Sequence, residues 1–167
     1  MLPEVSGDIL HSTAHVIAHG VAPNDHFDSG LALSLRERWP AMFKDFRHYC
    51  KVGNPKAGEI WTWGGVDGAR VVALLTQDAP PNQNARPGPA TLQHLNHALK
   101  ALAAEIEREG FESVALPKLA TGVGRLDWND VQPLIQQHLG GLGIPVVVYS
   151  EYHAGVAADE PLEDRVG

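Results

Sequence analysis

The segment "SVALPKLATGVGRLDW" (113–128) combines three features that could bind an anion. It begins as an apolar run typical of a buried strand, passes through the glycine-containing stretch "TGVG", and ends at "LDW", where a helix is expected to start. Gly122 and Gly124 permit close approach of the backbone, and exposed N–H groups at a helix start attract negative charge. Glycine spacing alone also fits an ordinary strand-to-helix turn, which leaves both interpretations open.

A second segment, "HGVAPNDHFDSGLA" (19–32), has the same organisation. It follows the short apolar run "HVIAHGV", and Ser29 and Gly30 stand where the next helix is expected to open. In an open α/β sheet, ligands bind beyond the carboxyl ends of the strands, so the two loops should face one crevice. Two such turns could hold two linked phosphates.

The elements that would position these loops alternate along the chain. Apolar patterning predicts strands at 15–21, 58–63, 70–77, 113–120 and 144–151, the second and third forming a hairpin. Helices are predicted over 29–50 with an interruption at Pro40, over 90–110 with Gly110 as C-cap, and from Pro133 onward after a short turn. This alternation predicts an α/β fold with a mixed, largely parallel central sheet between two layers of helices.

Length and composition indicate one domain. The chain has 167 residues, of which 44% are hydrophobic, enough for a single core. We place the domain at residues 1–153 and expect residues 154–167 to form an acidic, mobile tail, because hydrophobic periodicity ends there. No apolar run approaches the length of a membrane span and the start lacks a secretion signal, so we expect a cytoplasmic protein with no membrane partner.

Charge and cysteine content narrow the function. A formal charge of −7 and a pI near 5.6 argue against binding nucleic acid through many phosphate contacts. Cys50 is the single cysteine, which excludes an internal disulfide and a cysteine-based zinc site. His15 and His19 would lie about 13 Å apart on a strand, too far for one ion to bridge. We therefore expect no metal and no cofactor.

With these loops in place, the sequence resembles a macrodomain, the ADP-ribose-binding module, over about residues 6 to 152. The resemblance rests on "GDIL", on "VIAHGV" leading into "SGLA", on "ALPKLATGVGRLDW" followed by "VQPLI", and on "VVVYSE". Within the superfamily it is most similar to the branch of terminal ADP-ribose glycohydrolases and DNA-linked ADP-ribose glycohydrolases of toxin systems. It implies a three-layer α/β/α macrodomain.

The resemblance implies a role for each matching position. Asp8 would accept a hydrogen bond from the adenine amino group, with a backbone contact from Ile9, and Tyr149 or Tyr152 would pack near the adenine. The positions that would lie along the phosphates and the distal ribose are His19, Ser29, Gly30, Leu31, Thr121, Gly122, Val123, Gly124 and Arg125.

Three departures from the branch concern catalysis. The lysine of the lysine-dependent glycohydrolases falls at Gln77, which lies beside the ligand but cannot form a Schiff base. The expected acidic residue falls at Gly124, and the first glycine of the "SGLA" turn is replaced by Asp28. A lysine-independent mechanism is therefore required if the protein is an enzyme.

Three functions remain, which we rank in order. In the first, the protein hydrolyses ADP-ribose ester-linked to acidic side chains, using a water held between a ligand phosphate and a carboxylate. Asp28, Asp78 and His26 are the candidate bases or water holders, and Arg86 would steady the leaving carboxylate. The second function is a reader that only binds ADP-ribose. The third is a phosphatase acting on the anomeric phosphate of phosphorylated ADP-ribose.

The expected partner is ADP-ribose or an ADP-ribosylated protein. A modified nucleic acid is also compatible with the sequence, since low general affinity for DNA does not exclude recognition of a modified base. The sequence carries no signal for oligomeric state.

Overall fold

The computed structural model describes residues 2–162 and is built on one six-stranded sheet with the order β1-β6-β5-β2-β4-β3. The strands are β1 (Glu4–Gly7), β2 (Val16–Val21), β3 (Ile60–Gly64), β4 (Arg70–Leu75), β5 (Val114–Pro117) and β6 (Val146–Tyr152). All neighbouring strands are parallel except β3 and β4, which form the predicted antiparallel hairpin. The predicted mixed, largely parallel sheet is therefore confirmed.

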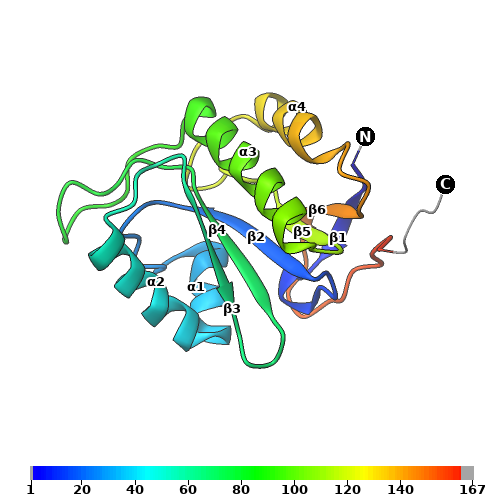
Figure 1. Ribbon diagram of the computed structural model, residues 1–167, viewed down its shortest axis with the longest axis horizontal. Coiled ribbons are helices and arrows are strands. Elements are labelled where there is room, and N and C mark those ends of the chain that lie inside the picture. The colour runs from blue at the N-terminus through cyan, green and yellow to red at the C-terminus, as the bar shows by residue number, and fades with distance from the viewer. Residues whose placement is uncertain (1, 163–167) are drawn as a thin grey trace.

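Within residues 2–162 the chain forms four helices, which cover the two faces of the sheet. Figure 1 shows this arrangement. The helices are α1 (Gly30–Arg38), α2 (Pro40–Gly53), α3 (Leu92–Glu109) and α4 (Trp128–Leu139), and the 3₁₀ turn η1 (Ile9–His11) follows β1. The first two helices pack on one face and the last two on the other. The predicted three-layer architecture is confirmed.

Side-chain alternation along β2 shows why the sheet needs helices on both faces. Val16 and Ala18 belong to the core under α3 and α4, whereas Ile17 and Val21 belong to the core under α1 and α2. Successive side chains of a strand point to opposite faces, so an apolar strand must be buried on both. Each fully buried branched aliphatic side chain contributes about 1.5–3 kcal/mol.

Local signals set most helix boundaries. Pro40 stands at the first position of α2 and separates it from α1, as predicted. Gly110 ends α3 with a φ of 68°, the left-handed conformation that glycine adopts readily. Thr91 begins α3 by accepting a hydrogen bond from the His94 N–H at 3.0 Å. Asp127 caps α4 in the same way through the Asn129 N–H.

Two elements differ from the sequence predictions. Pro133 lies inside α4 and does not start it, because a continuous helix keeps Val131 and Ile135 on one buried stripe. Pro133 has no N–H to donate to the Asn129 carbonyl group, but the proline is exposed, so water can reach that carbonyl.

Strand β1 was not predicted at all. It has only four residues, and it is held by pairing with β6, which lies at the far end of the chain.

The segment beyond β6 stays close to the domain as far as the structure describes it. Ala158 and Leu162 pack against the core under α1 and α2. The remaining residues of the predicted tail, 163–167, lie outside the described residues, and the division of the chain at residue 153 stays a prediction. No helix within residues 2–162 is long and apolar enough to cross a membrane.

Candidate functional site

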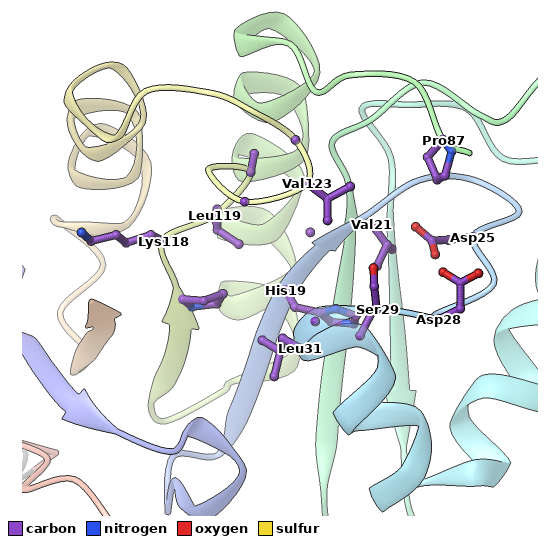
Figure 2. A pocket seen from close by; sticks show the side chains of 17 residues that line it. His19, Val21, Asp25, Asp28, Ser29, Leu31, Pro87, Lys118, Leu119 and Val123 are labelled. Atoms are coloured by element: carbon purple, nitrogen blue, oxygen red, sulfur yellow. The ribbon is translucent and has the colours of Figure 1, made fainter. Parts of the chain in front are cut away.

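The two loops that follow the middle strands of the sheet face one cavity of about 250 Å³ (Figure 2). One loop connects β2 to α1 and the other connects β5 to α4. Both begin at the same edge of the sheet because β2 and β5 are parallel. Gly30 from the first loop and Gly122 from the second both line the cavity. The two glycine-containing turns therefore converge, as the sequence led us to expect.

A second cavity of about 360 Å³ adjoins the first. It is lined by Asp8 and Ile9 after β1 and by Tyr149 and Tyr152 on β6. Both cavities share Gly30, Leu31 and Pro117, so they form one continuous crevice. An elongated ligand can run from the edge at β1 to the loop after β2.

The start of α1 presents backbone N–H groups to this crevice. Ser29 is the N-cap residue, but its side chain makes no capping hydrogen bond. Gly30 has a φ of 59°, a conformation that a residue with a side chain adopts only with strain. The first N–H groups of a helix have no partner within the helix, and together with the helix dipole they favour an anion.

The loop after β5 is a compact turn closed by its own hydrogen bonds. The Leu126 N–H donates to the Ala120 carbonyl at 2.9 Å, and the Arg125 N–H donates to the Gly122 carbonyl at 3.1 Å. The Thr121 hydroxyl donates to the Lys118 carbonyl at 2.8 Å. These bonds leave Gly122 exposed on the cavity side. The loop can therefore approach a ligand without an intervening side chain at that point.

His19 lies at the base of the first cavity and is only 2% exposed. Its ring packs edge-on against Phe27, with centroids 5.5 Å apart. Neither ring nitrogen has a hydrogen-bond partner within residues 2–162. Burial lowers the pKa of His19 to about 4, so the ring is neutral near pH 7. A buried polar group of this kind normally bonds water or a ligand.

Asp25 and Asp28 bring two carboxylates to the far end of the same cavity (Figure 2). Asp25 accepts hydrogen bonds from the Ala22 N–H at 3.1 Å and the Phe27 N–H at 2.9 Å. Burial raises the pKa of Asp25, the two backbone bonds oppose this, and the negative charge of Asp28 adds to it. Asp28 is exposed. Pairs of carboxylates in unlike surroundings are typical of acid–base sites.

Asp25 was missed by the sequence interpretation. The available signal was the spacing of two aspartates in "NDHFDS", between a buried strand and a helix start. Local sequence did not distinguish Asp25, which faces the cavity, from His26, which faces a separate cavity with Arg47 and Gln83.

The crevice brings together most of the residues expected to bind ligand. Those that line it are Asp8, Ile9, His19, Asp28, Ser29, Gly30, Leu31, Gly122, Val123, Gly124, Tyr149 and Tyr152. Those that line neither of its two cavities are His26, Gln77, Asp78, Arg86, Thr121 and Arg125.

Three of the residues that do not line the crevice, Gln77, Asp78 and Arg86, belong to the long loop after β4. The Gln77 side-chain amide donates to the Gly88 carbonyl at 3.1 Å and is buried beneath the loop. The Asp78 carboxylate pairs with His94 at 2.8 Å. Arg86 is exposed, and the next residue, Pro87, lines the first cavity. Within residues 2–162, no group of three or more His, Cys, Asp or Glu side chains lies close enough to hold a metal ion.

A three-layer domain with a crevice formed by backbone loops at the carboxyl ends of its strands belongs to the class of α/β folds that bind ligands at this edge of the sheet. A family model described as Macro domain matches residues 25–135, and the chain belongs to that family. The macrodomain predicted from its motifs is confirmed.

Two relatives are similar in sequence over most of this chain, and a solved structure is similar in fold. The DNA ADP-ribosyl glycohydrolase of Mycobacterium tuberculosis is 29% identical over 134 residues, covering 79% of this chain and 37% of that protein. Human ADP-ribose glycohydrolase OARD1 is 19% identical over 134 residues, covering 80% of each. The solved macrodomain of Thermus aquaticus DarG superposes with a TM-score of 0.77 at 25% identity, covering 90% of this chain and 98% of that one. The chain thus spans well under half of the mycobacterial relative.

Proposed function

We propose that the protein binds ADP-ribose in the continuous crevice and hydrolyses ADP-ribose that is ester-linked to acidic side chains. The observation that carries the proposal is the convergence of Gly30 and Gly122 on one cavity that opens into the cavity beside Asp8. Such a crevice matches a ligand with a base at one end, a diphosphate in the middle and a second ribose beyond it.

The hydrogen-bonding groups along the crevice suggest the ligand's orientation. The adenine lies between Asp8 and Tyr149, and the diphosphate lies between the start of α1 and the loop around Gly122. The distal ribose then reaches the end of the first cavity, beside Asp25 and Asp28. Two relatives support ADP-ribose as the ligand. The mycobacterial protein is named a DNA ADP-ribosyl glycohydrolase and the human protein an ADP-ribose glycohydrolase.

The proposed reaction uses water and no lysine. A water held by a ligand phosphate and Asp28 attacks the anomeric carbon of the distal ribose and gives its proton to Asp28. The bond from that carbon to the ester oxygen breaks, and the side-chain carboxylate leaves with the electron pair. Asp25 keeps the loop in place through its two backbone bonds. Arg86, which is exposed next to the cavity-lining Pro87, turns toward the crevice to steady the leaving carboxylate.

Binding without catalysis is the second candidate, favoured by one specific observation. Gln77 and Gly124 occupy the positions where the lysine-dependent branch has its reacting pair, and Gln77 is hydrogen-bonded away from the crevice. ADP-ribosylated DNA is the alternative macromolecular substrate, since several relatives are named as DNA ADP-ribosyl glycohydrolases.

Incubation with a protein automodified on glutamate and aspartate, beside calorimetric titration with ADP-ribose, separates these candidates. We expect binding and release of free ADP-ribose, with release reduced about 100-fold or more in Asp28→Ala, the usual effect of removing a general base. His26→Ala is the matched control from the same loop and should retain release. Binding with no release supports the reader. Absence of binding rejects both candidates.

A further inference from the structure

The segment after β6, residues 153–162, which we call the return segment, runs back along β1 and η1 (Figure 1). The His153 N–H donates to the Gly7 carbonyl at 3.1 Å, and the Asp8 N–H donates to the Val156 carbonyl at 2.7 Å. The Gly155 N–H donates to the Asp8 carboxylate oxygen Oδ2 at 2.9 Å. The return segment therefore holds both the backbone and the side chain of Asp8.

Glu160 attaches the return segment at a second point. Its carboxylate accepts a hydrogen bond from the Ser12 hydroxyl at 2.6 Å and from the Thr13 N–H at 2.9 Å. The Ser12 hydroxyl in turn accepts a bond from the Ala14 N–H at 3.1 Å. This attachment lies just after η1, so it links the return segment to the turn that begins at Asp8.

The contact between β1 and the return segment is closely fitted. Gly7 has a φ of 152°, and a Cβ atom there would lie 2.8 Å from the Val156 carbonyl oxygen and 3.0 Å from the Ala158 Cβ atom. No side chain fits at this position while the return segment is in place.

Tyr149 lines the same cavity as Asp8 and also neighbours Glu160 of the return segment. Burial raises the pKa of Tyr149 above its ordinary value, and the negative charge of Glu160 raises it further.

Two backbone N–H groups, one on each carboxylate oxygen, fix the orientation of the Asp8 side chain. Its Oδ1 atom accepts from the Leu10 N–H at 3.0 Å and its Oδ2 atom accepts from Gly155. Only 6% of Asp8 is exposed, yet it lines the cavity beside Tyr149. Each carboxylate oxygen can accept a further hydrogen bond, so the group remains an acceptor for a ligand.

We infer that the return segment is a positioning element for base recognition, with Glu160 as its attachment residue. It fixes the Asp8 carboxylate so that the crevice selects a 6-amino purine over a 6-oxo purine. The inference rests on the proposed binding of ADP-ribose. A fixed, nearly buried acceptor discriminates strongly, because a 6-oxo group offers it no hydrogen and places a second acceptor against the carboxylate, whereas a loosely held carboxylate can turn away.

The test compares ADP-ribose with inosine diphosphate ribose, in which oxygen replaces the 6-amino group and N1 carries a hydrogen. For the full chain we expect the dissociation constant of the inosine ligand to exceed that of ADP-ribose by about tenfold or more, the effect of one hydrogen bond to a charged group. In Glu160→Ala this ratio should fall at least about threefold, because ADP-ribose affinity drops while affinity for the inosine ligand is retained. Asp159→Ala removes a neighbouring exposed carboxylate and should leave the ratio unchanged.

Each outcome separates the inference from the proposed function. Equal loss of affinity for both ligands in Glu160→Ala, or an unchanged ratio, overturns the inference while the ADP-ribose site stands. If neither ligand binds the unmodified chain, the proposed function itself fails. Should Glu160→Ala not fold, Ser12→Ala removes one bond of the same attachment and is expected to lower the ratio by a smaller factor. An unchanged ratio in folded Ser12→Ala also overturns the inference.

Discussion

The Ala90 N–H donates a hydrogen bond of 3.2 Å to the Gly124 carbonyl oxygen and joins the long loop after β4 to the loop after β5. A Cβ atom at Gly124 would lie 2.6 Å from the Ala120 carbonyl oxygen and 2.8 Å from the Ala90 Cβ atom. Both neighbours are backbone or the first side-chain carbon, so neither can rotate away. Position 124 therefore has no room for the acidic side chain that the resemblance to lysine-dependent glycohydrolases would place there.

Gly124→Ala should lower the free energy of unfolding by about 1–3 kcal/mol, the usual cost of overpacking a well-filled site. Gly122→Ala is the matched control, because a Cβ atom at Gly122 meets nothing within 4 Å. Its effect should stay within about 0.5 kcal/mol. Urea denaturation followed by circular dichroism measures both. Equal stability of the two variants would show that the loops do not pack as described.

A larger side chain at Gly122 should block the ligand without damaging the fold. Gly122 lines the cavity beside the start of α1, so the branched side chain of Gly122→Val would occupy the space assigned to the diphosphate. We expect ADP-ribose affinity to fall about tenfold or more while the thermal midpoint is unchanged. Gly141→Val, at another open glycine, is the control and should bind normally. Normal binding by Gly122→Val in calorimetry would place the diphosphate elsewhere.

Stability should depend on pH through His19. Burial lowers its pKa from 6.5 to about 4 in the folded chain, so the unfolded chain binds more protons between these values. The free energy of unfolding therefore falls as the pH drops through this window, by about 3 kcal/mol in total. The raised pKa of Asp25 acts in the opposite direction, so the contribution of His19 is isolated by a variant.

His19→Asn should show a shallower dependence of unfolding free energy on pH between 6.5 and 4 than the unmodified chain. His97→Asn, which changes an exposed histidine of α3, should keep the original slope. Denaturant titrations at a series of pH values provide the measurement. An identical slope in His19→Asn would mean that the imidazole is solvated in the folded protein.

Replacing the proline inside α4 should stabilise the protein. Pro133 lacks the N–H that would donate to the Asn129 carbonyl, and it is exposed, so alanine fits without repacking. We expect Pro133→Ala to raise the free energy of unfolding by about 1–3 kcal/mol. Gln137→Ala, an exposed position on the same helix, should change it by less than about 0.5 kcal/mol. A destabilised Pro133→Ala protein would instead indicate a contact made by the proline ring.

Helix and strand positions followed from the sequence wherever the signal was local. Apolar periodicity located five of the six strands, and Pro40 and Gly110 stood at the expected helix boundaries. Prediction failed where a distant segment decides the outcome. Strand β1 depends on pairing with β6, and the helix through Pro133 depends on burying Val131 against the sheet.

Some features of the candidate site were likewise predictable from the sequence, and others were not. Sequence alone determined the family, the two glycine-containing loops and their placement at the carboxyl ends of parallel strands, because these follow from short motifs and the order of elements. Only the tertiary structure decided that Asp25 faces the cavity, that Asp78 is paired with His94, and that position 124 is closed to side chains. Those facts depend on how loops far apart in the chain pack together, and no local pattern of residues encodes that packing.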